Sequence, residues 1–100
     1  MAKGYWIAHV DVHDPQAYRA YLEANGAVFR KFGARFLVRG GPNELVEGRG
    51  RERNVVLEFE SYQVALACYR SPEYQPVKAL RESASEADIL IIEGYDGPQP

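Results

Sequence analysis

The sequence predicts an α+β protein with an antiparallel sheet and the ferredoxin-like order strand, helix, strand, strand, helix, strand. Two observations support this prediction. Apolar and polar residues alternate with a period of two over 4–12, 35–39 and 55–61, as they do along half-buried strands. The helix-start signals Asp14-Pro15 and Ser61 follow the first and third of these segments directly.

The first half of the chain is expected to hold a strand at 4–12, a helix and a second strand at 35–39. Apolar residues recur at helical spacing after Pro15. They are Tyr18, Tyr21, Leu22, Val28, Phe29 and Phe32. Asn25-Gly26 interrupts this stripe, and we expect a bend there because glycine in a helix interior costs ~1 kcal/mol relative to alanine. Gly33 is expected to end the helix.

In the second half, a turn at 40–43 and a short edge strand at 44–47 are expected to precede the charged loop 48–53. The helix after Ser61 meets a second start signal, Ser71-Pro72, and should restart there. Pro76 should break or restart that turn again, and the helix should end near 84–86. The last strand is expected at 88–95.

This order of elements places both helices on one face of the sheet. The side chains expected beneath the helices are Trp6, Val10, Phe36, Val38, Leu57, Phe59, Leu90 and Ile92. The opposite face is expected to expose Tyr5, Ile7, Leu37, Val56, Ile89, Ile91 and Tyr95. So much contiguous apolar surface is unusual for a monomer, and we therefore expect a homodimer formed through that sheet face.

Size and composition indicate one domain at 1–95 with a flexible tail at 96–100. The net charge is −2 and no basic cluster is present, which argues against binding to nucleic acid or to an anionic membrane surface. There is one cysteine and no long apolar run. A reducing compartment fits this usage, and we expect a cytoplasmic protein.

Three groups of residues, taken in order, resemble the DUF1330 family of small proteins of unknown function. The first is Tyr18 and Tyr21 after Asp14-Pro15. The second is the run 36–41, and the third is Glu58-Phe59 followed by the run 69–75, Tyr-Arg-Ser-Pro-Glu-Tyr-Gln. The resemblance implies a dimeric α/β-barrel, in which two ferredoxin-like subunits press their sheets together. It implies no catalytic residues, and this chain has Cys68 where the family pattern has tryptophan.

Side chains that could bind or deprotonate a substrate are expected on the sheet face that the helices leave uncovered. Candidate catalytic residues there are His9, Asp11, Arg39 and Glu58. A histidine beside a carboxylate can act as a general base, and an arginine can hold a substrate carboxylate. The alternative is that these charges pair with one another at the dimer interface. We also expect some tyrosine hydroxyls to line a cleft between helix and sheet near Gly26.

No metal site and no cofactor site are expected. His9 and His13 lack recognisable ligand spacing, and Cys68 is expected to be a small buried hydrophobe rather than a nucleophile. Three functions remain open on the sequence. They are a cofactor-free enzyme acting on a small acidic or phenolic molecule, a non-catalytic small-ligand binder, and a purely structural homodimer.

Overall fold

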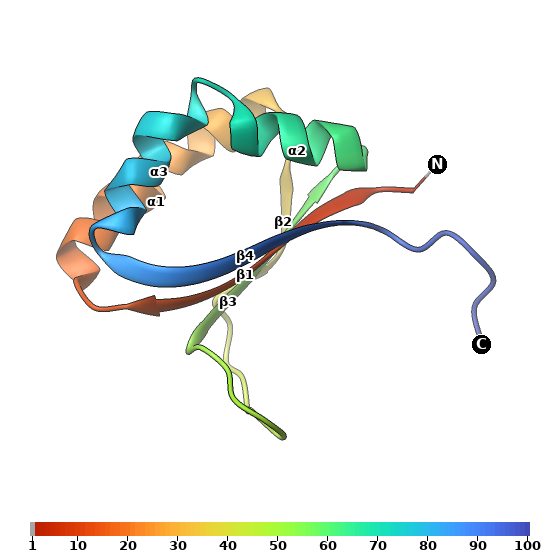
Figure 1. Cartoon of the computed structure of the whole chain (residues 1–100), viewed down its shortest axis with the longest axis horizontal. Helices are drawn as coiled ribbons and strands as arrows, with labels where there is room; N and C mark the ends of the chain where they lie inside the picture. Colours follow the sequence, from red (N-terminus) through yellow and green to blue (C-terminus); the bar gives the residue numbers. More distant parts are fainter. Residues whose placement is uncertain (1) are drawn as a thin grey trace.

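The computed structural model describes residues 2–100; Met1, with which the predicted domain begins, lies outside the described residues. The elements are β1 (Gly4–Val12), α1 (Pro15–Lys31), β2 (Arg35–Arg39), β3 (Arg53–Phe59), α2 (Tyr62–Arg70), α3 (Tyr74–Glu82) and β4 (Ser85–Glu93). The strands form one antiparallel sheet in the order β2-β3-β1-β4. The helices lie together over one face of it (Figure 1). The predicted ferredoxin-like order is confirmed, with the second helix in two pieces.

The first helix begins where the sequence predicts. The Asp14 carboxylate accepts a hydrogen bond from the backbone N–H of Ala17 at 3.1 Å, and Pro15 occupies the first helical position. The helix continues through Gly26 as one element. Gly33 follows it with a φ of 70°, the left-handed conformation that ends many helices.

The two pieces of the second helix are separated at Ser71-Pro72, as predicted. The Ser61 hydroxyl caps α2 by accepting from the backbone N–H of Val64 at 3.1 Å. The Ser71 hydroxyl accepts from the backbone N–H of Tyr74 at 3.1 Å and donates to a carbonyl of α2 at 2.8 Å. Pro76 does not break α3, because it lies in the first turn, where its missing N–H would have had no helical acceptor.

Trp6 is at the centre of the core between helices and sheet. Its indole N–H donates to the carbonyl of Ala65 at 2.8 Å, so its one polar group is satisfied. Four aromatic rings lie with centroids 5.2 to 5.6 Å from it: Phe29, Phe59, Tyr69 and Tyr74. Cys68 is fully buried beside this cluster, which confirms that it packs as a small hydrophobe.

The predicted faces of β4 are wrong. Trp6 lies opposite Ile91 and Ala8 lies opposite Ile89, so these two isoleucines point toward the helices. Leu90 and Ile92 point away from them and are 55% and 43% exposed. The run Ile-Leu-Ile-Ile has no alternating polar residues to show which of its side chains face the helices. Pairing with β1 decides this instead.

The predicted faces of β2 are correct only as far as Phe36. The pairing with β3 shifts between Phe36 and Val38, and this bulge adds one residue to the strand. Val38 therefore lies opposite Val56 on the face away from the helices, and Arg39 lies opposite Val55 on the helix side. Both placements reverse the prediction, because a shift of one residue exchanges the faces of all that follows.

The segment that joins β2 to β3 extends beyond the sheet, on the side away from the helices (Figure 1). The edge strand predicted at 44–47 is absent, since no residue from 41 to 52 joins the sheet. At its base the backbone N–H of Gly40 donates to the carbonyl of Asn54 at 2.8 Å. No helix within residues 2–100 has both the length and the hydropathy to cross a membrane.

We call the sheet surface opposite the helices the open face. Its apolar side chains are Tyr5, Ile7, Val38, Val56, Leu90 and Ile92. They adjoin one another across all four strands. The open face is therefore apolar across its middle, as the sequence predicts, although β2 and β4 supply different residues than expected.

Candidate functional site: a cationic pocket between helices and sheet

Three of the four predicted site residues lie on the open face, and each has a partner there. His9 is exposed and lies opposite Asn54, whose side-chain oxygen is 2.5 Å from its Nδ1. Since an amide oxygen only accepts, Nδ1 of His9 is the donor. Asp11 accepts from Arg51 at 2.8 Å and from the backbone N–H of Glu52 at 3.1 Å.

Glu58, the third of these residues, is at the other end of the same strand pair. It accepts from the Tyr5 hydroxyl at 3.0 Å, and Arg35 lies 3.8 Å away. The hydrogen bond to Glu58 raises the pKa of Tyr5. β1 and β3 are neighbours as predicted, but His9 is four register positions from Glu58, roughly 13 Å along the strand. The expectation that His9 or Asp11 lies beside Glu58 is therefore wrong.

Arg51 forms ion pairs with three carboxylates at the end of the open face where Asp11 lies. It contacts Asp11 and Asp88 at 2.8 Å and Glu86 at 3.4 Å. Hydrogen bonding, first of all to Asp88, raises the pKa of Arg51. These contacts show mutual pairing of the charges on the open face. Within residues 2–100 no group of three His, Cys, Asp or Glu side chains is placed to hold a metal ion.

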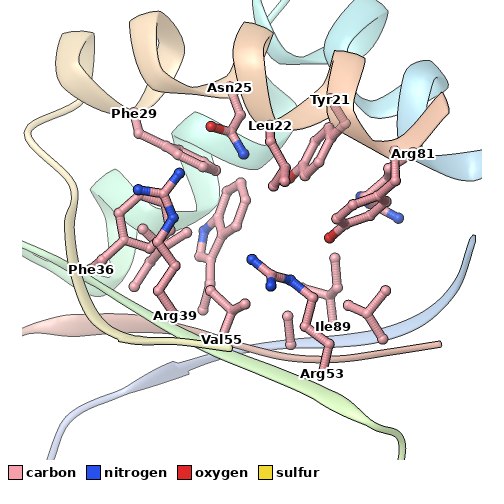
Figure 2. Close-up of a pocket in the computed structure, with 15 residues that line it drawn as sticks. Tyr21, Leu22, Asn25, Phe29, Phe36, Arg39, Arg53, Val55, Arg81 and Ile89 are labelled. Carbon is pink, nitrogen blue, oxygen red and sulfur yellow. The ribbon is translucent and has the colours of Figure 1, made fainter. Parts of the chain in front are cut away.

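Arg39, the fourth predicted residue, instead helps to line a pocket on the helix side of the sheet. The pocket has about 430 Å³ of space between its atoms, its mouth included. Its walls are apolar and aromatic, with Trp6, Phe29 and Phe36 among them. Figure 2 shows side chains from α1, α3 and the sheet converging on it. The predicted cleft between helix and sheet is present, and Tyr18 and Tyr21 line it.

The pocket carries positive charge without a matching negative one. Arg39, Arg53 and Arg81 line it, and no aspartate or glutamate does. None of the ion pairs found in residues 2–100 includes any of these arginines. Arg81 is only 7% exposed. A buried guanidinium is costly to the fold unless something negative compensates it, and within residues 2–100 Arg81 has only a hydrogen bond to the Tyr74 hydroxyl and a contact with the Tyr21 ring.

Two further polar groups in the pocket have no partner within the described part of the chain. Asn25 is 2% exposed, and its side-chain oxygen makes no hydrogen bond. The buried Nε of Arg53 makes none either. In Figure 2 Asn25 projects from α1 toward the cavity and Arg53 extends into it from the sheet opposite. An unpaired buried polar group costs about 1–3 kcal/mol, so both groups call for a hydrogen-bond partner from outside the protein, a water or a ligand.

A chain of hydrogen bonds supports the α3 side of the pocket. Nε of Arg81 donates to the Tyr74 hydroxyl at 3.2 Å, and the Tyr74 and Tyr21 hydroxyls are 2.9 Å apart. Burial raises the pKa of Tyr21 and of Tyr74. Both phenols are therefore neutral at physiological pH and act as hydrogen-bond donors.

The pocket shares lining residues with a larger groove on the surface. The space that water-sized spheres can enter is about 30 Å³ inside the pocket and about 690 Å³ in the groove between α1 and the turn at 40–43. The inner space holds about two waters. Tyr18, Leu22 and Arg53 line both cavities. A molecule larger than two waters would fit inside only if side chains such as Arg53, which line both cavities, moved.

Sequence reasoning did not single out Asn25, Arg53 or Arg81 as site residues, although two of them carried a signal. Asn25 lies in the apolar stripe of α1, and Arg81 follows Tyr74 and Val77 at helical spacing on the buried side of α3. A polar residue in an apolar helical stripe is a marker for a buried polar site. Arg53 was assigned to a loop, and its position in β3 gave no such signal.

The fold and the pocket define a class: ferredoxin-like α+β subunits with an open antiparallel sheet, of the kind found in dimeric α/β-barrels. Residues 3–95 match the model of a domain of unknown function, DUF1330. The chain belongs to this family. None of the curated proteins matches the sequence significantly.

Solved structures share the fold at low sequence identity. A protein of unknown function from Rhodopseudomonas palustris has a TM-score of 0.76 at 17% identity, covering 96% of this chain and 85% of its own. The cofactor-independent oxygenase SnoaB of Streptomyces nogalater has a TM-score of 0.63 at 13% identity, with 100% and 97% covered. A dimeric ferredoxin-like protein of unknown function from Jannaschia sp. CCS1 has a TM-score of 0.61 at 15% identity, with 90% and 97% covered. Identities this low establish a shared fold and no shared activity.

Proposed function

We propose that this protein binds a small acidic or phenolic organic molecule, as its anion, in the pocket between helices and sheet. The observation that carries the proposal is the unpaired charge of Arg39, Arg53 and Arg81 around an apolar, aromatic-walled cavity. The aromatic walls suit a flat organic body, and the guanidinium groups suit a carboxylate or phenolate.

The unpaired groups also favour ligand binding over a purely structural role. A protein that only self-associates gains nothing from a buried, unpartnered Asn25 side-chain oxygen in the same pocket as an uncompensated Arg81. An apolar replacement at either position would be less costly to the fold. The anion supplies negative charge and hydrogen-bond acceptors for the arginines, whereas the Asn25 oxygen, itself an acceptor, needs a donor.

The binding unit in this proposal is a homodimer formed through the open face. The exposed Leu90, Ile92 and Val38 side chains lie on that face, away from the pocket. The Jannaschia protein of the same fold is dimeric. Pairing of two open faces would cover this apolar surface and leave each pocket on the outside of the assembly. The cytoplasmic location stays a prediction from the sequence.

Conversion of the bound molecule without a cofactor is a second candidate function. It is favoured by the neutral Tyr21 hydroxyl, which lines the pocket and can stabilise negative charge developing on a substrate oxygen. The shared fold with a cofactor-independent oxygenase supports it only as an analogy. Turnover of a bound probe, followed by product analysis, would separate this candidate from simple binding.

The test of binding compares benzoate with benzyl alcohol, a neutral molecule of similar shape. Benzoate is expected to raise the melting temperature in proportion to its saturation of the site, because it binds only the folded state. Benzyl alcohol is expected to have little effect. Equal shifts from both, or none from benzoate, 4-nitrophenolate and phenylacetate, would overturn the proposal.

A pair of variants locates the binding site. Arg53→Met should abolish the benzoate shift, since it removes a guanidinium that lines the pocket. Arg35→Met is the matched control. It removes the same charge from the molecule, but the Arg35 side chain is 72% exposed and lies on the open face, away from the pocket. A similar loss with both variants would show that net charge, not the pocket, attracts the anion.

A further inference from the structure

The hydroxyl groups of Tyr21 and Tyr74 form an ordered relay with Arg81, and the direction of its hydrogen bonds can be worked out. Arginine is only a donor, so its Nε–H donates to the Tyr74 oxygen. Tyr74 is fully buried, and its only other side-chain partner within residues 2–100 is Tyr21. The proton of Tyr74 must therefore go to Tyr21 or remain unpaired.

The hydrogen bond from Tyr74 to Tyr21 is favoured, because an unpaired proton on the fully buried Tyr74 hydroxyl is costly. Tyr74 then donates to Tyr21, and the proton of Tyr21 is left over. No hydrogen bond from that proton is found among the described residues, the unpaired Asn25 oxygen in the same pocket included, and Tyr21 lines the pocket (Figure 2). The relay runs from Arg81 through Tyr74 and Tyr21 and ends as a free donor at the cavity.

We infer that the Tyr21 hydroxyl donates a hydrogen bond to a charged oxygen of the ligand, and that Tyr74 and Arg81 are positioning residues which strengthen this donation. The inference rests on the proposed function and deepens it. The ligand oxygen is a carboxylate or phenolate oxygen, because a chain of hydrogen bonds that begins at a cation is polarised toward a negative acceptor. A hydrogen bond from Tyr21 depends on direction and acts only at short range, whereas the charges of Arg39 and Arg53 attract an anion from any direction.

The raised pKa of Tyr21 agrees with this role, because burial keeps the phenol protonated and able to donate. The titratable and charged groups beside the tyrosines of the relay are Tyr18, Tyr69, Arg53 and Arg81. Arg81 also lines a separate surface cavity with His9, Lys78, Glu82 and Asp88. Neither carboxylate lines the pocket that Tyr21 lines, so neither competes there with the ligand for the Tyr21 proton.

The experiment uses 4-nitrophenol, whose ionisation is visible in its absorption spectrum, bound to the protein. Stabilisation of the phenolate in the pocket should lower the pKa of the bound probe below that of the free probe. Tyr21→Phe should weaken phenolate binding about tenfold, the low end for a hydrogen bond to a charged group, and should raise the pKa of the bound probe by about one unit. Binding of benzyl alcohol should not change.

Two further variants separate a donor role from a packing role. Tyr74→Phe interrupts the relay but leaves the Tyr21 hydroxyl, so the pKa of the bound probe should rise by less than in Tyr21→Phe. Tyr69→Phe removes a hydroxyl beside Tyr74 that does not line the pocket, and it should leave the bound probe unchanged. Thermal unfolding confirms that each variant is folded.

The outcomes distinguish the two proposals. Binding of 4-nitrophenolate with the same bound pKa in wild type and Tyr21→Phe would overturn the relay while the anion site stands. Equal effects of Tyr21→Phe and Tyr69→Phe would also overturn it. Failure of benzoate, 4-nitrophenolate and phenylacetate to bind the wild-type protein would overturn the proposed function and the relay with it.

Discussion

Arg39 stacks on the ring of Phe36, with its Cζ 4.0 Å from the ring centroid. Residues three apart in a regular strand point to opposite faces of the sheet, so this contact requires the bulge between them. The bulge thus transfers one positive charge from the open face to the pocket. The apolar ring beneath the guanidinium holds it flat while leaving its N–H groups free for a ligand.

Replacement of Arg39 by methionine should weaken benzoate binding about tenfold, because one charge-assisted contact of roughly 1.5–3 kcal/mol is lost. Methionine keeps an apolar contact with Phe36, so the free energy of unfolding should change little. Isothermal titration calorimetry measures the affinity, and Arg35→Met is the control. Unchanged affinity in Arg39→Met would place Arg39 outside the binding site.

Two glycines should respond to alanine in opposite directions. Gly26→Ala adds a methyl group to the middle of α1 with no atom within 4 Å of it, and should stabilise the protein by about 0.5–1 kcal/mol. Gly4→Ala would place its Cβ 2.3 Å from the carbonyl oxygen of Ser61, and should destabilise it by about 2 kcal/mol or more. Urea unfolding measures both. A loss of stability in Gly26→Ala comparable to that in Gly4→Ala would contradict the packing described for α1.

A charge in the centre of the open face should prevent dimerisation. Ile7 lies between Val56 and Leu90, so Ile7→Glu would bury an unpaired carboxylate at the proposed interface. The dissociation constant of the dimer should rise by at least about 100-fold, as measured by sedimentation equilibrium. Leu80→Glu is the control, because Leu80 is 37% exposed but lies on α3, on the other side of the sheet. A wild-type monomer at working concentration would refute the dimer itself.

Stability should fall at alkaline pH because of Cys68. Burial raises the pKa of its thiol to about 12, whereas an unfolded cysteine titrates near about 8.5. Between these values the unfolded chain has lost a proton that the folded protein retains, so the free energy of unfolding decreases by about 1.4 kcal/mol per pH unit. Below pH 8 the thiol is neutral in both states and contributes no slope.

Urea unfolding at pH 8 and pH 10 measures this decline in the wild-type protein and in Cys68→Ala. The variant starts from a lower stability because it leaves a small cavity, but its decline between the two pH values should be smaller. Burial also raises the pKa values of Tyr21 and Tyr74, and these residues lower the free energy of unfolding mainly above pH 10. The same decline in both proteins would show that Cys68 is not the group responsible.

Most of the fold could be predicted from local patterns, whereas most of the site could not. The caps at Asp14 and Ser61 and the alternation in β1 and β3 are properties of neighbouring residues, and the structure confirms them. Asn25, Arg53 and Arg81 come from three different elements. Their meeting in one pocket depends on contacts between residues 28 or more apart in the chain, which no local pattern encodes.

The sequence by itself determined the four strands of the sheet, its helices, their order, and the side of β1 and β3 that meets the helices, although it also predicted an edge strand at 44–47 that does not form. Backbone geometry ties side-chain direction to position within one element. Only the tertiary structure decided the faces of β4 and of β2 beyond Phe36, since strand pairing and a bulge set them. It thereby placed Arg39 with Arg53 and Arg81 in the pocket and left His9, Asp11 and Glu58 on the open face. The physical reason is that a shift of one residue in strand register moves every following side chain to the other face of the sheet, and pairing with the neighbouring strand sets that register.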